Sequence, residues 1–479
     1  MKLKDLLKGI KIEKTLGSVD VDIKSIENDS KTVSKGSLFV ALTGKDFDGH
    51  KFVREAEIYG AVAVIVEREM ETSLTQIVVK DTREALSIIS GNFYLNPAKK
   101  MKIVGVTGTN GKTTTASLIR SVLDYAGIPC GLIGTLGAYY GKTHVETFLT
   151  TPDPKDLHKI LFDMYNAGIK VVVMEVSAHA IDLKKVQGIP FEIGVFTNLS
   201  QDHLDYFLDM ETYKNAKLKF FDKRCKYIVS NSDDEVGREI IKNNVGVISY
   251  GINNPADVFA MDVKTNAKNT EFILNLFDAV YEFRTGLIGV HNVENLLATC
   301  TVSALLGVKT DLIVEKLSRA VAVSGRLEKI EYKNYDIYVD YAHTPDGLKK
   351  VLLALKHEIK GRLICVFGCG GNRDEQKREI MGKISGEYAD FTVITSDNPR
   401  FEDPMMIIKD VEKGVLSKTN NFVVVEDRRE GIKYALNYAK SGDVVLIAGK
   451  GAEKYQEILG IKHPYNDKDT VNEILRIKK

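Results

Sequence analysis

The sequence predicts an α/β protein whose sheets consist mainly of parallel strands. Short runs of β-branched and other apolar residues recur from residue 101 onward, and such runs are typical of parallel strands buried on both faces. Most of them are followed by a polar or glycine-rich loop and then by a segment with helical periodicity. This repeated order of strand, loop and helix is the pattern of doubly wound sheets.

Three domains are expected from the length and from two breaks in the pattern. A chain of 479 residues is too long for one ordinary core. The segment Asn96–Lys100 contains a proline and polar lysines, and Ser324–Glu328 precedes a further apolar run, so we place boundaries at both. The prediction is a smaller α/β domain over residues 1–100, a central doubly wound sheet over 101–324 and a Rossmann-like domain over 325–479.

Composition places the chain among soluble globular proteins. Hydrophobic residues make up 44% and charged residues 27%, and the net charge is +1, which gives no global signal for nucleic acid or a membrane surface. Five scattered cysteines favour a reducing compartment, and Cys365 and Cys369 read as buried structural thiols. No apolar run has the length of a membrane span or a signal peptide, so we expect a cytoplasmic protein.

The most specific local pattern is a phosphate-binding loop at Val104–Thr115, which reads VGVTGTNGKTTT. A strand feeds a glycine-rich turn, then Lys112, Thr113 and a helix. Backbone N–H groups of such a turn approach phosphate oxygens, the lysine reaches the outer phosphates, and the hydroxyl of Thr113 is a ligand for Mg²⁺. Val106 stands where the strict spacing requires glycine, so this is a variant of the motif. The alternative is a plain connection between strand and helix.

Three strands of the last domain each end in an unusual polar sequence. The apolar runs at 363–367, 391–395 and 443–448 are followed by GCGGNRD, SDNPR and GKGAE. Ligands of doubly wound sheets bind outside the carboxyl ends of the strands. The sequence therefore predicts a second binding site at this edge.

Three further residues remain open from chemistry alone. Glu175 follows a strand and is either a structural carboxylate or a metal ligand. His203 also follows a strand, and a single histidine is more often structural. Lys217 lies on an amphipathic helix, where a solvated position is the ordinary interpretation.

The variant loop TGTNGKTTT, together with matching segments from about Ile26 to Asp467, resembles the Mur ligases. These are ATP-dependent amide-forming enzymes of bacterial cell-wall precursor synthesis. The resemblance implies that ATP is held by the loop and by residues around it: Gly108, Thr109, Asn110, Gly111, Lys112, Thr113, Thr114, Asn292, Asn295, Arg326, Asp340 and His343. Ser324 replaces the proline that usually precedes the Gly-Arg of this hinge.

The resemblance also implies a Mg²⁺ site and a modified lysine. The expected metal ligands are Thr113, Glu175, His203 and Lys217, with Lys217 carbamylated by CO₂. Lys112, His203 and Lys217 are the expected catalytic residues. Carbamylation requires a neutral amine, which burial or nearby cations can supply.

For the nucleotide-sugar substrate, UDP-N-acetylmuramoyl-L-alanyl-D-glutamate, the resemblance implies contacts in the first two domains. These residues are Asn28, Ser30, Lys45, Asp46, Thr150, Thr151, Ser177 and Lys185. Leu149 stands where some members have asparagine. Lys185 replaces an arginine and lacks its bidentate geometry.

The incoming amino acid is indicated by Asp397-Asn398-Pro399-Arg400, because this version of the motif accompanies meso-diaminopimelate in the family. Its second amino-acid head would place a carboxylate near Arg400 and an ammonium near Glu453, while Arg373 offers a further bidentate site and Gly449 a close backbone approach. Ala452 replaces the usual histidine of GKGHE.

The expected reaction is formation of an amide through an acyl phosphate, with ATP and Mg²⁺ as cofactors. The expected enzyme is a monomer that acts on small molecules and does not bind nucleic acid. Four alternatives stay open: a ligase adding L-lysine, an enzyme like folylpolyglutamate synthase, a P-loop ATPase without ligase activity, and a non-catalytic nucleotide-sugar-binding protein.

Overall fold

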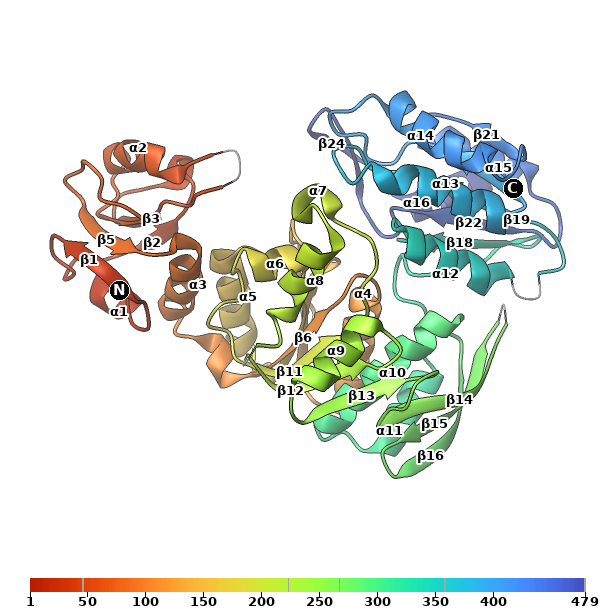
Figure 1. Ribbon diagram of the computed structural model, residues 1–479, viewed down its shortest axis with the longest axis horizontal. Coiled ribbons are helices and arrows are strands. Elements are labelled where there is room, and N and C mark those ends of the chain that lie inside the picture. Colours follow the sequence, from red (N-terminus) through yellow and green to blue (C-terminus); the bar gives the residue numbers. More distant parts are fainter. Residues whose placement is uncertain (45–46, 223, 267, 357–358, 478–479) are drawn as a thin grey trace. The chain divides into compact units, whose positions relative to one another are not determined.

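The computed structural model shows a mixed α/β protein with several parallel-rich sheets (Figure 1). It describes residues 1–44, 47–222, 224–266, 268–356 and 359–477. The chain divides into two compact units that alternate along the sequence. Unit 1 is Met1–Val106, Ile128–Gly194 and Lys219–Lys226, and unit 2 is Thr107–Gly127, Val195–Leu218 and Tyr227–Lys479. The domain boundaries expected near residues 100 and 325 stay a prediction.

Unit 1 begins with a five-stranded sheet in the order β1-β5-β4-β3-β2. Its strands are β1 (Ile12–Leu16), β2 (Ser25–Glu27), β3 (Ser37–Val40), β4 (Ala63–Val66) and β5 (Thr75–Val79). All neighbours are parallel except β1 and β5. Side chains alternate between the faces of a strand, so Leu38 and Val40 join one buried cluster while Phe39 joins another. Both faces of this sheet are therefore covered, as parallel strands require.

The rest of unit 1 contains strands in the order β6-β10-β7-β8-β9. Their bounds are β6 (Lys102–Thr107), β7 (Cys130–Gly134), β8 (Gly137–Tyr140), β9 (Thr143–Val145) and β10 (Val171–Glu175). Strand β10 is parallel to β6 and β7, and β7, β8 and β9 are antiparallel neighbours. The expected linker Asn96–Lys100 forms a 3₁₀ turn (Pro97–Lys100) in which Pro97 and Ala98 are buried, so it is packed and not merely polar.

Unit 2 contains a region with strands β12 (Cys225–Asn231), β13 (Val247–Gly251), β14 (Val258–Thr265), β15 (Thr270–Leu276) and β16 (Ala279–Thr285). Strands β12, β13 and β14 are parallel neighbours, whereas β14, β15 and β16 form an antiparallel meander. The meander differs from the parallel pattern that the sequence led us to expect. Its middle strand shows the reason, since buried and more exposed residues alternate along β15, as in an antiparallel strand with one solvated face.

The last sheet has the order β17-β18-β22-β19-β20-β21. Its strands are β17 (Glu328–Ile330), β18 (Asp336–Asp340), β19 (Leu363–Phe367), β20 (Phe391–Ile394), β21 (Phe422–Val424) and β22 (Val444–Ala448). All neighbours except β17 and β18 are parallel. Because β22, β19 and β20 are adjacent and parallel, the three polar sequences that follow them lie at one edge of the sheet.

Helices complete both units, and the pair β23 (Tyr455–Ile458) and β24 (Ile461–Pro464) lies outside the large sheets. The helices are α1 (Leu3–Leu6), α2 (Val53–Ile58), α3 (Thr82–Phe93), α4 (Lys112–Tyr125), α5 (Pro154–Asn166), α6 (Ala178–Asp182), α7 (Leu204–Phe207), α8 (Met210–Leu218), α9 (Glu235–Asn243), α10 (Val290–Leu305), α11 (Thr310–Ser318), α12 (Pro345–Lys356), α13 (Gln376–Tyr388), α14 (Pro404–Leu416), α15 (Arg428–Tyr438) and α16 (Asp467–Ile477). Among the described residues, none of these helices has the length and apolar character needed to cross a bilayer.

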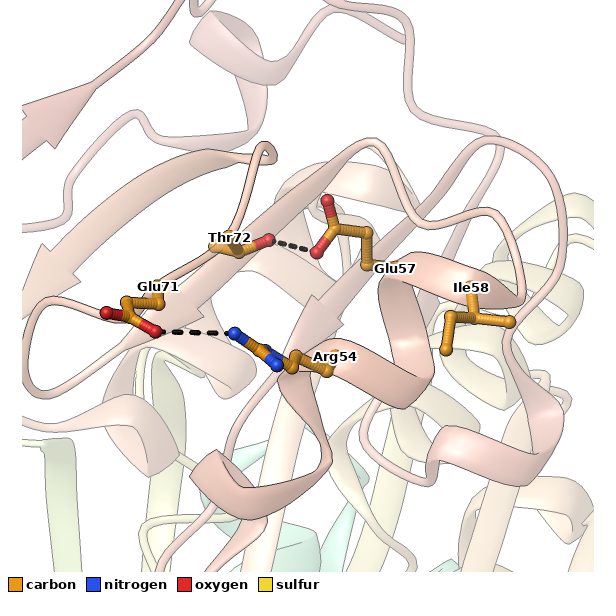
Figure 2. A pocket seen from close by; sticks show the side chains of 5 residues that line it. All are labelled: Arg54, Glu57, Ile58, Glu71 and Thr72. Atoms are coloured by element: carbon orange, nitrogen blue, oxygen red, sulfur yellow. Dashed lines mark hydrogen bonds and ion pairs between the residues drawn. The ribbon is translucent and has the colours of Figure 1, made fainter.

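A surface depression of about 440 Å³ lies on unit 1, between helix α2 and residues 71–72 (Figure 2). Its polar groups already bond to one another. Arg54 pairs with Glu71 at 3.3 Å, and the Thr72 hydroxyl donates to Glu57 at 2.7 Å. Its apolar member, Ile58, is 80% exposed. None of the residues lining it belongs to the sites expected from the sequence.

Candidate functional site

The glycine-rich loop lies in unit 2, and its carbonyl groups accept hydrogen bonds from the lysine at its end. Nζ of Lys112, the first residue of α4, donates to the carbonyl oxygens of Gly108 at 2.8 Å and Thr109 at 2.7 Å. Gly108 and Gly111 have φ angles of 144° and 86°, and a Cβ on them would collide with Thr197 and Asn295. Only glycine fits both positions. An arriving phosphate would offer Lys112 stronger, charged acceptors than these carbonyl groups.

The loop residues Thr109 and Asn110 are held from the side by the segment that follows β11 (Phe191–Phe196). The Asn110 N–H donates to Oδ1 of Asn198 at 2.9 Å, and the Thr197 hydroxyl donates to the Asn110 carbonyl at 2.7 Å. The Thr109 hydroxyl lies 3.2 Å from the Tyr213 hydroxyl. Three side-chain contacts thus hold Thr109 and Asn110 of the loop in place.

Two asparagines expected near the nucleotide lie behind the loop on α10. Asn295 Oδ1 accepts a hydrogen bond from Thr115 at 3.2 Å, and its Nδ2 donates to Asn292 at 3.1 Å. Asn292 in turn donates to the Ile288 carbonyl at 2.9 Å, and both side chains are buried. In this arrangement they support α4 and the loop from behind.

Arg326 reaches the loop from the segment before β17. Its Nη2 donates to the Thr113 hydroxyl at 2.9 Å, and its guanidinium lies 4.3 Å from the centroid of the Tyr341 ring. Asp340 fixes this segment by accepting from the N–H groups of Leu327 at 2.6 Å and Ala342 at 2.7 Å. Burial raises the pKa of the Asp340 carboxyl above its usual value. The structure therefore brings Thr113, Arg326 and Asp340 together.

Lys217 is buried, contrary to the solvated position that its helical pattern alone favours. It is 1% exposed, and its Nζ lies 4.6 Å from the centroid of the Tyr213 ring. The ring of His203 lies 5.9 Å from the same tyrosine. Burial, and secondarily the nearby Lys112 cation, place the pKa of the Lys217 amine well below its usual value. Tyr213 thus links two of the expected metal ligands.

The third expected ligand, Glu175, lies in unit 1 at the end of β10. Its carboxylate accepts from the Thr135 N–H at 2.9 Å and the Thr135 hydroxyl at 3.1 Å, and the residue is 2% exposed. Within the described ranges, no three His, Cys, Asp or Glu side chains form a ready-made metal cluster. A divalent cation held by the expected residues would need oxygens from a phosphate ligand as well.

Part of the expected nucleotide-sugar contacts adjoins Glu175. The Thr151 hydroxyl donates to the Glu175 carbonyl at 2.9 Å and accepts from the Ser177 N–H at 3.0 Å, while the Thr150 hydroxyl lies 3.1 Å from that of Thr135. Ser177 also caps helix α6. The Thr-Thr-Pro segment and Glu175 therefore form one hydrogen-bonded group.

The other expected nucleotide-sugar contacts are spread over unit 1. Ser30 is buried at the start of a 3₁₀ turn and Asn28 is exposed beside it. Lys185 pairs with Asp153 at 2.7 Å, so its charge is already engaged. Lys45 and Asp46 lie outside the described residues.

At the carboxyl edge of the last sheet, Asn398 and Glu453 meet around Lys450. Lys450 Nζ donates to Asn398 Oδ1 at 2.9 Å and to Glu453 Oε2 at 2.7 Å, and Asn398 Nδ2 donates to the same Glu453 oxygen at 3.0 Å. Although burial opposes it, Lys450 and Arg428 lower the pKa of the Asp397 carboxyl. The three strand ends thus converge as the sequence predicted.

The remaining acceptor residues are placed by backbone contacts. Arg400, at φ 53°, donates to the Gly371 carbonyl at 2.7 Å and pairs with Glu457 at 3.4 Å. Pro399 lies between Asn398 and Arg400, and a Cβ on Gly371 would collide with its carbonyl. Gly449 has φ 113°, and a Cβ there would lie 2.7 Å from Asp397.

Two of the observed departures from the family pattern lie at one contact in unit 2. The Ser324 hydroxyl donates to the Glu328 carboxylate at 3.1 Å. A hydrogen bond thus holds this segment at the position where proline is usual. The backbone of Ala452 packs against Gly325, whose φ of 67° and lack of a Cβ permit the approach.

A polar seam joins residues 201–205 to residues 373–377, and sequence reasoning missed it. Gln201 bonds to Asp374 at 3.1 Å, Asp202 to Lys377 at 3.4 Å, and Asp205 to Arg373 at 3.3 Å. His203 and His343 also face Asp202, at 3.3 and 3.6 Å. Burial alone would raise the pKa of the Asp202 carboxyl, but Lys377 and the two imidazoles hold it well below its usual value. Arg373 is therefore engaged by Asp205 in this structure.

Sequence reasoning also missed Arg428, which is fully buried between two strand ends. It pairs with Asp467 at 2.8 Å and donates to the Ala448 carbonyl at 2.9 Å, directly before Gly449. The sequence did contain a sign of this position, because Asp427-Arg428 follows the short strand β21 and therefore lies at the same edge of the sheet.

The fold and the loop define a class: an α/β enzyme that activates a substrate with ATP. The family models match as the Mur ligase family catalytic domain over residues 22–94, the Mur ligase middle domain over 106–303 and the glutamate ligase domain over 325–451. The chain belongs to the Mur ligase family, whose members are ATP-dependent ligases that form amide bonds.

Relatives cover the whole chain. It is 42% identical to the UDP-N-acetylmuramoyl-L-alanyl-D-glutamate–2,6-diaminopimelate ligase of Clostridium perfringens, with 100% of both chains covered. It is 42% identical to the ligase of the same name from Caldanaerobacter subterraneus subsp. tengcongensis, with 99% of both covered. A solved structure with that ligase name has a TM-score of 0.71 and 32% identity and covers 100% of this chain and 99% of its own.

Proposed function

We propose that this enzyme joins meso-diaminopimelate to UDP-N-acetylmuramoyl-L-alanyl-D-glutamate at the expense of ATP, in peptidoglycan precursor synthesis. The observation that carries the proposal is full-length similarity to ligases of that name, combined with the Asn398, Arg400 and Glu453 arrangement at the sheet edge. These side chains offer an amide, a guanidinium and a carboxylate to an acceptor with both a second carboxylate and a second ammonium.

The first half of the reaction is phosphoryl transfer. An oxygen of the D-glutamyl γ-carboxylate attacks the γ-phosphorus of ATP, the bond to the bridging oxygen breaks, and ADP leaves. Lys112 exchanges its carbonyl partners for phosphate oxygens, and Arg326 stands close enough to the loop to meet the same charge. Positioning and electrostatics supply most of the acceleration in such transfers.

The second half forms the amide. The neutral amine of diaminopimelate attacks the acyl carbon, phosphate leaves with the bonding electron pair, and the nitrogen loses a proton to solvent. Asn398, Arg400 and Glu453 hold the far end of the acceptor, so that its reacting amine is presented to the acyl phosphate. Orientation of this kind lowers the entropic part of the barrier.

The residues that would hold Mg²⁺ are Thr113, Glu175, His203 and a carbamylated Lys217, together with phosphate oxygens. A hydroxyl next to the loop lysine is the usual protein ligand in such sites, so Thr113 fits the role. Mg²⁺ bound there would neutralise charge on the phosphates.

Carbamylation of Lys217 is supported by its burial beside Tyr213 and by its lowered pKa. The amine lone pair attacks CO₂, and the nitrogen releases one proton, which converts the side chain into an anion. Carbon-13 NMR of the enzyme in ¹³C-bicarbonate should show one carbamate resonance that disappears in the Lys217→Met variant. A spectrum without that resonance in the active enzyme would remove the modification from the mechanism.

The direct test of the function is phosphate release from ATP with the UDP-muramoyl dipeptide and either meso-diaminopimelate or L-lysine, with the product mass measured. We expect turnover with diaminopimelate and little with lysine. Turnover mainly with lysine would overturn the acceptor assignment. Release that depends on neither amino acid would indicate a simple ATPase, and turnover with a folate substrate would indicate the folylpolyglutamate alternative.

We further infer a monomeric, cytoplasmic enzyme, since all five cysteines are free thiols and its substrates are small soluble molecules. Light scattering coupled to size exclusion should give a mass near 53.3 kDa.

A further inference from the structure

We propose that Lys450 is the positioning residue that sets the preference of the acceptor site for an amino acid with a second carboxylate. The inference rests on the proposed function. Lys450 follows Gly449 at the end of β22, and it is 0% exposed. It reaches Asn398 and Glu453, the two side chains on which recognition of the second head depends.

The first argument is the orientation of the Asn398 amide. Its oxygen accepts two hydrogen bonds, from Lys450 Nζ at 2.9 Å and from the Glu457 N–H at 2.9 Å. Reversal of the amide would place its NH₂ group against two donors and remove both bonds. Lys450 and the Glu457 N–H therefore together fix the amide with its nitrogen on the side of Glu453, and Lys450 supplies the charged one of the two bonds.

The second argument is the set of donors that this orientation leaves. The NH₂ group of Asn398 has two hydrogens, and one of them goes to Glu453 Oε2. The other is a neutral donor suited to a ligand carboxylate. Loss of the Lys450 bond would hold the amide less firmly, and an amide that reverses presents its oxygen, which repels a carboxylate.

The third argument is the charge of the group. Lys450 and Arg428 face Glu453, Asp397 and Asp467, so the five residues carry a net charge of −1. Replacement of Lys450 by a neutral residue changes this to −2. The added negative charge disfavours the distal carboxylate of diaminopimelate, whereas L-lysine has no such carboxylate and keeps its distal ammonium.

The test compares kcat and KM for ATP, the UDP-muramoyl dipeptide, meso-diaminopimelate and L-lysine in the wild type and in Lys450→Met, Lys450→Gln and Lys450→Arg. We expect Lys450→Met to raise the KM for diaminopimelate by about tenfold to a hundredfold, the effect of losing one charge-assisted hydrogen bond and its alignment. The ratio of kcat/KM for diaminopimelate over lysine should fall by at least about tenfold. Lys450→Arg should restore part of the ratio because it keeps the charge and the donors.

The matched control is Asp443→Asn, at the opposite end of the same strand. Asp443 is buried and accepts from Arg362 Nη2 at 2.7 Å and from the Arg362 N–H at 2.8 Å. This change should lower thermal stability and leave the acceptor ratio unaltered. Thermal melts of every variant show whether the protein is folded at the assay temperature.

A ratio unchanged in folded Lys450 variants would overturn the inference. So would unfolding of all three Lys450 variants under conditions in which Asp443→Asn stays folded, because that result assigns Lys450 to the fold alone. A wild type that does not use diaminopimelate would refute the proposed function itself, and it is recognised before any variant is measured.

Discussion

Among the described residues of unit 2, Lys217 and Lys450 are both fully buried, but their electrostatic surroundings differ. Lys217 lies beside an aromatic ring and near a second cation, Lys112, and none of the ion pairs among the described residues includes it. Lys450 lies against the Glu453 carboxylate at 2.7 Å and the Asn398 carbonyl oxygen at 2.9 Å. Lys217 thus lacks a direct ionic partner in the part of the chain that the structure describes, although the Asp202 and Asp234 carboxylates partly offset the effect of its burial, whereas Lys450 has such a partner.

The different surroundings of Lys217 and Lys450 suit them to different roles, one as a reactive group and the other as a residue that positions its neighbours. Burial lowers the pKa of the Lys217 amine and so favours its neutral, nucleophilic form, which the proposed carbamylation requires. A lysine whose charge is paired has its donors committed, so it can only fix its neighbours. The environment therefore indicates the role of each lysine better than its exposure does.

The largest expected effect is on catalysis at the uncompensated lysine. Lys217→Met should reduce ligase turnover by about a thousandfold or more, because it removes an anionic group that would help to hold the Mg²⁺ that neutralises charge on the transferring phosphoryl group. The measurement is kcat with all substrates saturating. Lys219→Met is the matched control, since Lys219 is a more exposed lysine two residues along the chain. Equal turnover rates of Lys217→Met and the wild type would contradict the catalytic role proposed for Lys217.

The next effect is on stability at the fully paired cation Arg428. Arg428→Met should lower the free energy of unfolding by about 3–5 kcal/mol, because Asp467 would remain buried without its partner. Arg362→Met should cost less, since the Arg362 side chain is 31% exposed and water can reach the pair. Urea unfolding of the two variants measures both values. If Arg362→Met lowered the free energy of unfolding as much as Arg428→Met, the burial of the ion pair would not determine the size of the effect.

Contiguous motifs and repeated topology could be predicted from the sequence. The loop from Gly108 to Thr113 is local, so its strand, turn and helix are readable in order. The convergence of the strand ends at Gly368, Ser396 and Gly449 could also be anticipated, because parallel strands place their carboxyl ends at one edge.

The surroundings of buried charges could not be read from local pattern. Helical periodicity alone assigned Lys217 to the surface, whereas in the folded protein it is 1% exposed and its Nζ lies over the Tyr213 ring. Lys450 and Arg428 take their partners from residues that are far away in the sequence or on another strand end, as Asn398 and Asp467 show. Such pairs depend on the folded sheet, so the sequence can place Arg428 at the sheet edge after β21 but cannot name its partner.

The two lysines should also differ in the sign of their effect on stability. In CO₂-free buffer at pH 7, Lys450→Met should lower the unfolding free energy by about 2–3 kcal/mol, because Glu453 Oε2 and Asn398 Oδ1 each lose a charged donor and the partly buried Glu453 carboxylate loses its ion pair with Lys450. Lys217→Met should raise it by about 1 kcal/mol, since it replaces an uncompensated amine with an apolar chain.

The sign at Lys217 follows from its lowered pKa. The unfolded chain binds a proton there up to about pH 10.4, whereas the folded protein releases it at lower pH. Burial of this group therefore destabilises the fold at low pH, and does so less as the pH rises toward that value. The advantage of Lys217→Met over the wild type should therefore shrink between pH 7 and pH 10. An advantage that grows with pH would contradict the assignment.

A last test concerns unit 1, at a buried base without a hydrogen-bond partner among the described residues. His158 on α5 is 3% exposed, and neither ring nitrogen has a hydrogen-bond partner among the residues that the structure describes. Burial lowers the pKa of this imidazole to about 4. The pKa of this imidazole is about 6.5 in the unfolded chain. Between pH 6.5 and pH 4 the unfolded chain therefore binds more protons than the folded protein. The wild type loses stability as the pH falls through this range, by about 2 kcal/mol at pH 5. His158→Leu should lack that part of the loss, and urea unfolding at pH 7 and pH 5 measures it. Equal losses of stability in His158→Leu and the wild type would mean that the imidazole binds its proton as readily in the folded protein as in the unfolded chain. His158 would then have a partner for its charge, as Lys450 has.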